Sequence, residues 1–327
     1  MRPLISICIP TYNRAEILQK SLESYVNNEH FCSEFEIVIS DNASTDNTQY
    51  IGELYAAKYN NIKYFRNVEN ISDKNFSLSL DRATGEYLKL MKDNVIIVGD
   101  GLKYLIDAVK SYQTTRKSLF FTNGFLYNSC KTDCYECHNF EEFIVHSSFR
   151  VTAITFFGCW REQWTKVIDR DKYSRLQLAQ DDWVYQIITQ FPNSLLYTKK
   201  YFCTNEVGIR KGYNWFEVHV DNYYKIIHPY ITQGLITEKT IRKEKVTYLK
   251  GLKLPLLHKY MWKVLSSWEF DMSRTTEILN KNFGNIPFYY WLMATLPIWG
   301  VYEGIKYKIK VLMIKLGIKD LVYRIRK

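Results

Sequence analysis

The sequence predicts an α/β fold in which a mostly parallel β-sheet carries helices on its faces and is followed by a helical C-terminal region. Short β-rich runs alternate with helix-like segments through the first third of the chain, and this alternation favours a parallel sheet. Polar clusters follow three of the predicted strands, at the sheet edge where such folds bind ligands. Beyond residue 214 the chain is rich in Tyr, Trp and Lys and has a mainly helical pattern.

The individual elements rest on local patterns. The run 4–9 is apolar, β-rich and bounded by Pro10, as a buried parallel strand should be. Residues 15–26 place Leu18, Leu22 and Tyr25 on one helical face. The same criteria predict strands at 35–40, 62–65, 87–91, 118–122 and 151–157, and helices at 48–59, 75–83 and 180–190.

Composition and charge narrow the functional classes. The 327 residues are 46% hydrophobic and 24% charged, which suits a protein with a sizeable core and excludes a disordered chain. The formal charge of +10 indicates an anionic partner, and residues 303–327 alone hold eight basic and two acidic side chains. The seven cysteines are no disulfide framework, and the first apolar run is too short for a secretory leader. We therefore expect a cytoplasmic location.

The polar clusters after the predicted strands lie at residues 11–14, 41–46 and 92–94. Carboxylates there can accept hydrogen bonds from a base or a ribose, and oxygen ligands suit Mg²⁺ or Mn²⁺ bridging a diphosphate. The sequence contains neither a G-x-x-x-x-G-K-[ST] loop nor a G-x-G-x-x-G loop, which disfavours P-loop and dinucleotide-binding folds. Each cluster taken alone has an ordinary alternative, because the same residue types make turns and cap helices.

Taken together and in order, the clusters resemble the family 2 glycosyltransferases. The resemblance rests on Pro10-Thr11-Tyr12-Asn13-Arg14, on Ser40-Asp41-Asn42-Ala43-Ser44-Thr45-Asp46, and on Gly85-Glu86-Tyr87-Leu88 leading into Lys92-Asp93-Asn94. Within this family, the motifs most resemble those of the bacterial O-antigen and capsule enzymes, including abequosyltransferase-like members. It is close over residues 1–100 and weaker up to residue 210.

The resemblance implies a GT-A fold with a Rossmann-like, mostly parallel sheet, a nucleoside-diphosphate sugar donor and inverting transfer to a hydroxyl. Residues 1–212 would form the catalytic domain, with a nucleotide-sugar half near 1–100 and an acceptor half near 101–212, before a helical region at 213–327. The positions that it assigns to nucleotide binding are Pro10, Thr11, Tyr12, Arg14, Asp41, Asp46, Asn75, Lys92 and Asp93.

The resemblance also implies a divalent cation, Mg²⁺ or Mn²⁺, at Asp93 and Asn94. The sequence departs from the family here, because Lys92-Asp93-Asn94 keeps one carboxylate where two or three acids are usual. Three alternatives stay open. A weakly held metal could be completed by the diphosphate and a distal residue such as His219, Lys92 could neutralise the leaving diphosphate instead, or the chain could be a degenerate, inactive member.

Two adjacent acids are the candidate catalytic pair. An inverting transfer needs a carboxylate that removes the proton from the acceptor hydroxyl. Asp181 and Asp182 begin a helix-like segment and resemble the acidic pair that supplies the base of this family, with Asp182 in the register of the base. The alternative is that both acids merely complement the helix dipole. Trp160 lies in a segment that resembles the acceptor side, where it would stack on a sugar unless it is simply packed.

Two further patterns remain. Cys130, Cys134, Cys137 and His138 invite a zinc interpretation, but their spacing differs from that of structural zinc sites, and a reduced surface loop is favoured. Residues 282–302 are uncharged and aromatic, and residues 306–327 alternate apolar side chains with lysines, as in an amphipathic helix on an anionic membrane surface. A packed helical subdomain and a membrane-spanning helix are the alternatives. No recognised nucleic-acid module accompanies the basic residues.

These observations predict an inverting hexosyltransferase-type enzyme, peripheral on the cytoplasmic face of the cell membrane. It would transfer a sugar to a lipid-linked glycan acceptor during synthesis of a surface polysaccharide. A non-catalytic sugar-nucleotide or glycan-binding protein is the first alternative. A nucleotidyltransferase is disfavoured because a Gly-rich basic phosphate loop is missing after the first strand, where Tyr12-Asn13-Arg14 stands. The sugar, the nucleobase and the oligomeric state stay open.

Overall fold

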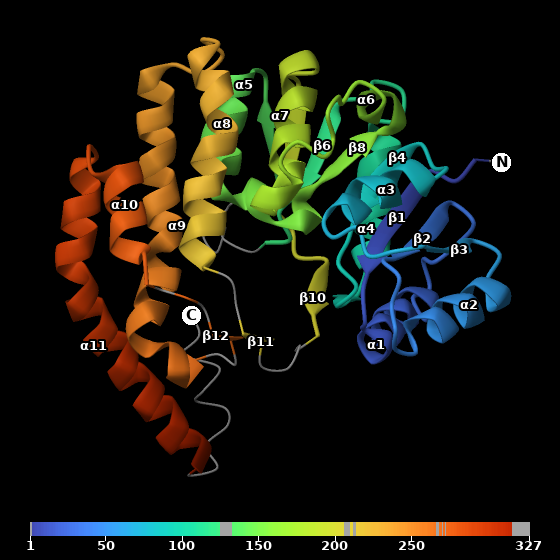
Figure 1. Ribbon diagram of the computed structural model, residues 1–327, viewed down its shortest axis with the longest axis horizontal. Coiled ribbons are helices and arrows are strands. Elements are labelled where there is room, and N and C mark those ends of the chain that lie inside the picture. Colours follow the sequence, from blue (N-terminus) through green and yellow to red (C-terminus); the bar gives the residue numbers. More distant parts are fainter. Residues whose placement is uncertain are drawn as a thin grey trace. The chain divides into compact units, whose positions relative to one another are not determined.

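The computed structural model describes residues 2–124, 133–205, 210–211, 214–265, 268–269, 271 and 273–315. The chain divides into two compact units. The first unit comprises residues 1–208 and 217–244, and the second comprises residues 209–216 and 245–327. In Figure 1 the first unit runs from blue through green to the yellow-orange of α8, and most of the second is orange and red.

A five-stranded sheet in the order β3-β2-β1-β4-β8 forms the centre of the first unit (Figure 1). Its strands are β1 (Ile5–Thr11), β2 (Phe35–Asp41), β3 (Ile62–Arg66), β4 (Tyr87–Leu90) and β8 (Gly158–Trp160). All neighbours are parallel except β8, which runs antiparallel to β4. Because Thr11 pairs with Asp41 at the ends of β1 and β2, the polar segments after both strands leave the sheet at the same edge.

Helices connect and cover these strands. They are α1 (Ala15–Val26), α2 (Thr48–Lys58), α3 (Lys74–Arg82) and α4 (Gly101–Ser111). Helix α3 packs on β1, β2 and β4, whereas α1 packs on α2 and on the short strand β5 (Val95–Ile97). Ile7, Ile37 and Leu22 are fully buried between these layers. The strands and helices predicted up to residue 91 are confirmed, with ends that differ by one or two residues.

A second, three-stranded sheet has the order β6-β9-β7, with β6 parallel and β7 antiparallel to β9. Its strands are β6 (Ser118–Phe121), β7 (Cys134–Cys137) and β9 (Ser194–Tyr197). The helix α7 (Ala179–Gln190), which was expected at 180–190, packs on α5 (Phe140–Ser147), on α8 (Tyr223–Thr232) and on the 3-10 turn η1 (Ser148–Thr152). The remaining elements here are the 3-10 turns η2 (Ile154–Phe156) and η3 (Ser174–Leu176), helix α6 (Arg161–Trp164) and strand β10 (Phe202–Thr204).

The predicted strand at 151–157 is wrong, because this segment folds into η1 and η2. Its backbone bonds are local: the amide of Phe156 donates to Ala153 O, and that of Phe157 donates to Ile154 O. Val151 and Phe156 are buried as the apolar pattern suggested. Burial of a short apolar run therefore does not distinguish a strand from a chain of tight turns.

The predicted boundary at residue 212 does not coincide with the division between the units. Residues 217–244 belong to the first unit, and they form the π-helix η4 (Glu217–Asn222), α8 and the start of α9 (Glu238–Leu265). The second unit contains the rest of α9, α10 (Thr275–Phe283), α11 (Pro287–Lys315) and the strand pair β11 (Arg210–Lys211) and β12 (Trp268–Glu269). Among the helices that the structure describes, none combines the length and the apolarity needed to cross a membrane.

Candidate active site

The loops after β1 and β2 are tied together into one polar surface, which we call the cradle and define as residues 11–14 and 41–46. The amide of Asn13 donates to Ser44 Oγ at 2.9 Å, and the amide of Thr45 donates to Asn13 Oδ1 at 2.7 Å. Asn13 and Ala43 have φ angles of 52° and 61°, a region that asparagine adopts more readily than most residues. Tyr12 and Asn13 are exposed on the cradle, whereas Pro10 is buried beneath it.

Asp93 joins the cradle to the loop after β4. Its carboxylate accepts hydrogen bonds from Thr11 Oγ1 at 3.0 Å and from Arg14 Nη1 at 2.9 Å, and Asp93 is only 5% exposed. Burial raises the pKa of Asp93, while the Arg14 charge and the two hydrogen bonds act in the opposite direction. The structure thus brings together Thr11, Arg14 and Asp93, which the sequence assigned to one nucleotide site.

Asp41 and Asn75 face the protein interior instead of the open surface of the cradle. Asp41 is fully buried and accepts hydrogen bonds from the Ser44 amide at 3.0 Å and from the Tyr64 hydroxyl at 2.6 Å. Asn75 is 3% exposed, and its side-chain amide donates to Ser40 O at 2.7 Å. In this arrangement both side chains bond to neighbouring residues of the protein, and their contact with a nucleotide stays a prediction. They hold the shape of the loops that do line the surface.

Asp46 is exposed at the end of the cradle and caps two helices. Its carboxylate accepts from the amide of Ala15 at 3.2 Å and from that of Thr48 at 2.9 Å, at the first residues of α1 and α2. Partial burial acts to raise the pKa of Asp46, but the hydrogen bonds from Thr48 and Ala15 outweigh it and lower the pKa. In this structure the side chain stabilises the two loops of the cradle from their outer end.

His219 lies next to the loop after β4, although it is far from that loop in sequence. It belongs to the π-helix η4, and its Nδ1 is 3.2 Å from Thr152 Oγ1. Burial, together with the positive charge of Lys92, lowers the pKa of His219 to about 3, so the imidazole is neutral at physiological pH. Single π-helical turns often occur at functional sites. The positive charge of Lys92 therefore acts on His219, although the two residues are far apart in sequence.

The residues at Asp93 and Asn94 offer a divalent cation an incomplete set of ligands. Asn94 Oδ1 is a buried oxygen without a hydrogen-bond partner among the described residues, as an unused ligand would be. Asp93, however, is the single carboxylate of the motif, and Thr11 and Arg14 already bind both of its oxygens. One charge-compensated carboxylate and one amide do not make up the oxygen-rich set that Mg²⁺ or Mn²⁺ prefers. Metal binding here stays a prediction.

The acidic pair lies at the start of α7. Asp182 is 4% exposed and accepts hydrogen bonds from the Tyr230 hydroxyl at 2.8 Å and from Gln186 Nε2 at 2.7 Å. Asp181 is fully buried, and neither of its oxygens has a partner among the described residues. Burial, and then the neighbouring Asp182, raises the pKa of Asp181 well above its usual range. Burial thus favours the protonated form of Asp181, and Asp182 is the member of the pair that is held in a fixed orientation by hydrogen bonds.

A chain of contacts connects the acidic pair with the loop after β4. Gln180 Nε2, one residue before the pair, donates to Thr152 O at 3.2 Å. The hydroxyl of the same threonine contacts His219. The positive charge of Lys92 helps to lower the pKa of this histidine. All of these residues belong to the first unit. Thr152 thus links the segment of the acidic pair to His219, whose pKa responds to the charge of Lys92.

Residues 6–167 match the family model "Glycosyl transferase family 2". This segment is a family 2 glycosyltransferase domain. The domain contains the whole cradle, Lys92 and Asp93, whereas the acidic pair and His219 follow it in the chain. The match agrees with the family that the three sequence motifs resemble.

Curated relatives and solved structures share this domain. The chain is 43% identical to abequosyltransferase RfbV of Salmonella typhimurium over 104 residues. This aligned segment covers 31% of each chain. It is 30% identical to the GalNAc(5)-diNAcBac-PP-undecaprenol beta-1,3-glucosyltransferase of Campylobacter jejuni over 106 residues. That segment covers 32% of this chain and 34% of that enzyme. The alignments thus span about a third of these relatives. S. aureus TarS 1–349 in complex with UDP-GlcNAc superposes with a TM-score of 0.54 and 16% identity over 96% of this chain and 92% of that chain. The fold of the glycosyltransferase domain is GT-A.

Trp160, the predicted acceptor-binding residue, is instead part of the core of the glycosyltransferase domain. It is fully buried, its Nε1 donates to Lys117 O at 2.7 Å, and the Arg116 guanidinium lies 4.4 Å from its ring centroid. No face of the ring is open to a sugar, so this prediction is wrong. The packing alternative holds because β8 inserts Trp160 between β4 and the loop before β6.

The cysteine cluster does not form a zinc site within the described part of the chain. Cys130 lies outside the described residues. Cys134 and Cys137 are free thiols in β7, and the structure brings together no group of metal-ligating side chains that includes them or His138 among the residues it describes. Burial raises the pKa of Cys134 to about 11 and that of Cys137 to about 12, which keeps both thiols protonated.

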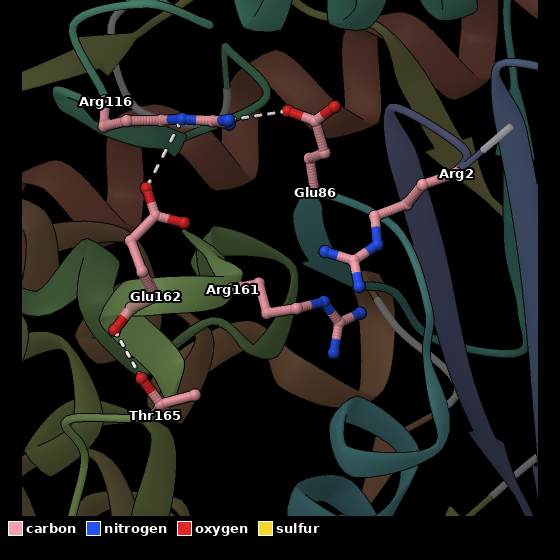
Figure 2. Close-up of a pocket in the computed structure, with 6 residues that line it drawn as sticks. All are labelled: Arg2, Glu86, Arg116, Arg161, Glu162 and Thr165. Carbon is pink, nitrogen blue, oxygen red and sulfur yellow. Dashed lines mark hydrogen bonds and ion pairs between the residues drawn. The ribbon is translucent and has the colours of Figure 1, made fainter.

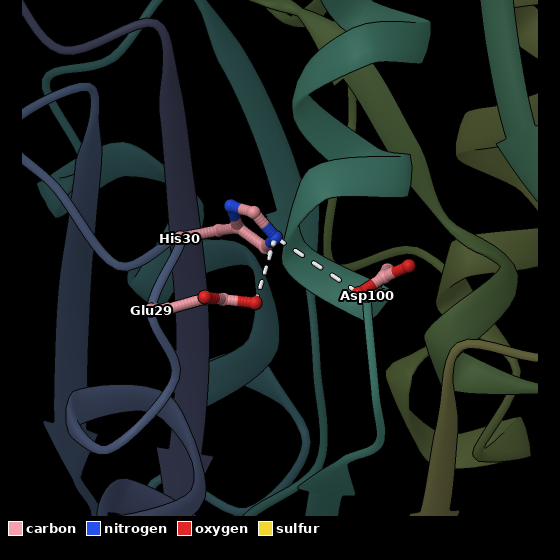
Figure 3. A group of neighbouring side chains, drawn as sticks. All are labelled: Glu29, His30 and Asp100. Atoms are coloured by element: carbon pink, nitrogen blue, oxygen red, sulfur yellow. Dashed lines mark ion pairs between the residues drawn. The ribbon is translucent and has the colours of Figure 1, made fainter.

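Two other clusters lie at the opposite edge of the sheet from the cradle. Figure 3 shows Glu29, His30 and Asp100, in which His30 Nε2 is 3.6 Å from Glu29 and 4.0 Å from Asp100. A second group of side chains lines a pocket of about 500 Å³. Figure 2 shows its lining, in which Arg116 forms ion pairs with Glu86 and Glu162, and Arg2, Arg161 and Thr165 lie nearby. Glu29 and His30 precede β2, and Arg2 and Glu86 precede β1 and β4, so both clusters lie at the amino ends of parallel strands. Ligands of this fold class bind at the other end.

Proposed function

We propose that this protein is an inverting glycosyltransferase that moves a sugar from a nucleoside-diphosphate donor to a hydroxyl group. Asp182 carries the proposal, because Tyr230 and Gln186 fix its carboxylate at the start of α7. A fixed carboxylate is what a general base for an acceptor hydroxyl requires. The family 2 domain that precedes it supports the same reaction class.

The reaction follows from the charges of these residues. Asp182 would remove the proton of the acceptor hydroxyl while the oxygen attacks the anomeric carbon from the face opposite the diphosphate. The diphosphate leaves with additional negative charge, which nearby cations stabilise. Lys92 is exposed for this role, whereas Arg14 is partly engaged by Asp93. His219 is neutral, so it can donate a hydrogen bond to the diphosphate without repelling a nearby cation.

We further propose a lipid-linked intermediate of a surface polysaccharide, such as an O-antigen or a capsule, as the acceptor. The support is the name of the Campylobacter jejuni relative, which specifies an undecaprenyl diphosphate-linked substrate, and the abequosyltransferase RfbV match. The acceptor lipid would place the enzyme on the cytoplasmic face of the cell membrane as a peripheral, hexosyltransferase-type enzyme, held in part by the basic C-terminal region. The donor half would use Pro10, Tyr12 and Asp46 around the nucleotide.

The experiment is a thermal-shift screen of nucleotide sugars with and without Mn²⁺ or Mg²⁺, followed by a transfer assay with each donor that stabilises the protein. Donor binding raises the melting temperature because the ligand binds the folded state. We expect one class of nucleotide sugar to stabilise the protein and to be turned over. Stabilisation that needs a divalent cation would support a metal at Asp93 and Asn94.

A non-catalytic sugar-nucleotide or glycan-binding protein is the second candidate, because the single carboxylate of the metal motif is already paired with Arg14. The same screen separates the two candidates. Stabilisation by a nucleotide without release of nucleoside diphosphate, for every donor and for extracted lipid-linked acceptors, would favour the binding protein and would refute the enzyme.

A further inference from the structure

We propose that the outward face of α11 is a docking face that lies flat in the headgroup region of an anionic bilayer. This deepens the membrane association proposed above by assigning it to particular side chains. The face, which we call the α11 stripe, consists of Trp291, Ile298, Val301, Tyr302, Ile305, Ile309 and Leu312, all of which are exposed.

The rotation of α11 about its axis is fixed by its inner side. Tyr289, Leu292 and Leu296 are at most 2% exposed and belong to the core of the second unit. The Tyr289 hydroxyl also donates to Asn280 Oδ1 at 2.6 Å. Because these contacts anchor one side of the helix, the α11 stripe faces outward as a consequence of packing.

The stripe is continuous along the helix. Its members 291, 298, 302, 305, 309 and 312 follow one another by three, four or seven residues, which places them on one helical face. At 1.5 Å per residue the stripe is about 30 Å long. Ile298 is 71% exposed and Leu312 is 57% exposed. An apolar patch of this length is uncommon on a monomeric soluble protein and marks an interaction site.

The charges beside the stripe favour a lipid surface as the partner. Lys306 and Lys308 are each one position from the stripe, on its two opposite sides, as expected for a helix in contact with anionic headgroups. Trp291 and Tyr302 have the amphipathic rings that prefer the interface between water and acyl chains. If two copies paired through their stripes, these lysines would be brought close to one another in an apolar setting, which is unfavourable. An apolar stripe with aromatic rings along it and lysines on both sides is typical of a helix that lies in the membrane interface.

The test is co-sedimentation of the full chain with vesicles of phosphatidylcholine alone or mixed with phosphatidylglycerol, without donor or acceptor. The double variant Ile305→Gln and Ile309→Gln should lower the partition coefficient at least tenfold. The matched control is Leu54→Gln with Ile168→Gln, which replaces two apolar side chains of the first unit that are 45% and 73% exposed, and it should bind as the wild type does. Lys306→Gln with Lys308→Gln should reduce the preference for phosphatidylglycerol, by about fivefold per lysine.

Other outcomes would overturn the proposal. Equal vesicle binding by the stripe variant and its control would show that the stripe does not dock. A change from oligomer to monomer in the stripe variant, measured by light scattering, with unchanged vesicle binding would assign the stripe to contacts between copies. Donor turnover is scored separately with a soluble acceptor, so failure of the docking face and failure of the glycosyltransferase proposal give different results.

Discussion

Removal of the Tyr230 hydroxyl should slow transfer while leaving donor binding unchanged. That hydroxyl donates to Asp182 Oδ1 at 2.8 Å, on a carboxylate that is 4% exposed. A hydrogen bond to a charged group contributes roughly 1.5–3 kcal/mol. If that energy orients the base in the transition state, Tyr230→Phe should lower kcat by about ten- to 150-fold. The donor Kd should stay the same, because the cradle does not contact Tyr230 through any hydrogen bond among the described residues.

A matched deletion separates orientation of the base from loss of stability. The Tyr224 hydroxyl donates to Glu244 Oε2 at 2.9 Å, in a buried site with the same chemistry but away from Asp182. Tyr224→Phe should therefore lower the free energy of unfolding to a similar extent and leave kcat intact. Initial rates and denaturant titrations on both variants provide the comparison. Equal loss of kcat in the two variants, or an unchanged kcat in Tyr230→Phe, would refute the reasoning.

Three further substitutions probe the cradle and the core. Arg14→Met leaves the buried Asp93 without its ion pair, so the variant should bind the donor more weakly in calorimetry. Its free energy of unfolding should be lower than that of the wild type, and this difference should shrink as the pH falls and Asp93 becomes protonated. Asp46→Ala should lower the free energy of unfolding in urea by about 1 kcal/mol at pH 7. The difference from the wild type should disappear in acid, because Asp46 is protonated below its lowered pKa and loses the charge that caps the two helices. Burial lowers the pKa of Lys89 to about 7 from 10.5, so the folded state holds fewer protons than the unfolded state between these values. The wild type should gain stability over Lys89→Met from pH 7 to 9, by at most about 1.4 kcal/mol per pH unit, and a flat difference would contradict the assignment.

The sequence predicted the fold of the donor half well because local signals dominate there. The runs predicted as strands at 4–9 and 35–40 are short and apolar, and their burial is complete in β1 and β2, where β1 continues through Pro10 to Thr11. Such runs admit few alternatives when helices separate them. The segment 151–157 has a similar apolar character but folds into tight turns, and its continuation Gly158–Trp160 joins the sheet as β8.

Which way a polar side chain points could not be predicted from the motifs. Thr11 and Asp41 end neighbouring strands in register. Thr11 reaches Asp93 at the site, whereas Asp41 turns inward to Ser44 and Tyr64. The residue types are compatible with either direction, and only the packing of the two loops decides between them.

The partners of the base could not be found from the sequence either. Tyr230 is 48 residues from Asp182, on α8, and no local pattern links the two. In the same way Thr152, His219 and Gln180 come together only through tertiary packing. Long-range contacts of this kind carry no signal in a single sequence, whereas an acidic pair at the start of a helix does.

The most direct test of Asp182 as the base is the single-turnover rate of sugar transfer by Asp182→Asn, measured with the donor identified in the screen. We expect the rate to fall by roughly 10²- to 10⁴-fold, as for loss of a general base, with the donor Kd unchanged. Asp181→Asn should lose much less, because burial already favours the protonated form of the Asp181 carboxyl, which an amide resembles. A wild-type rate in Asp182→Asn, with donor still bound, would contradict the assignment of this carboxylate as the base.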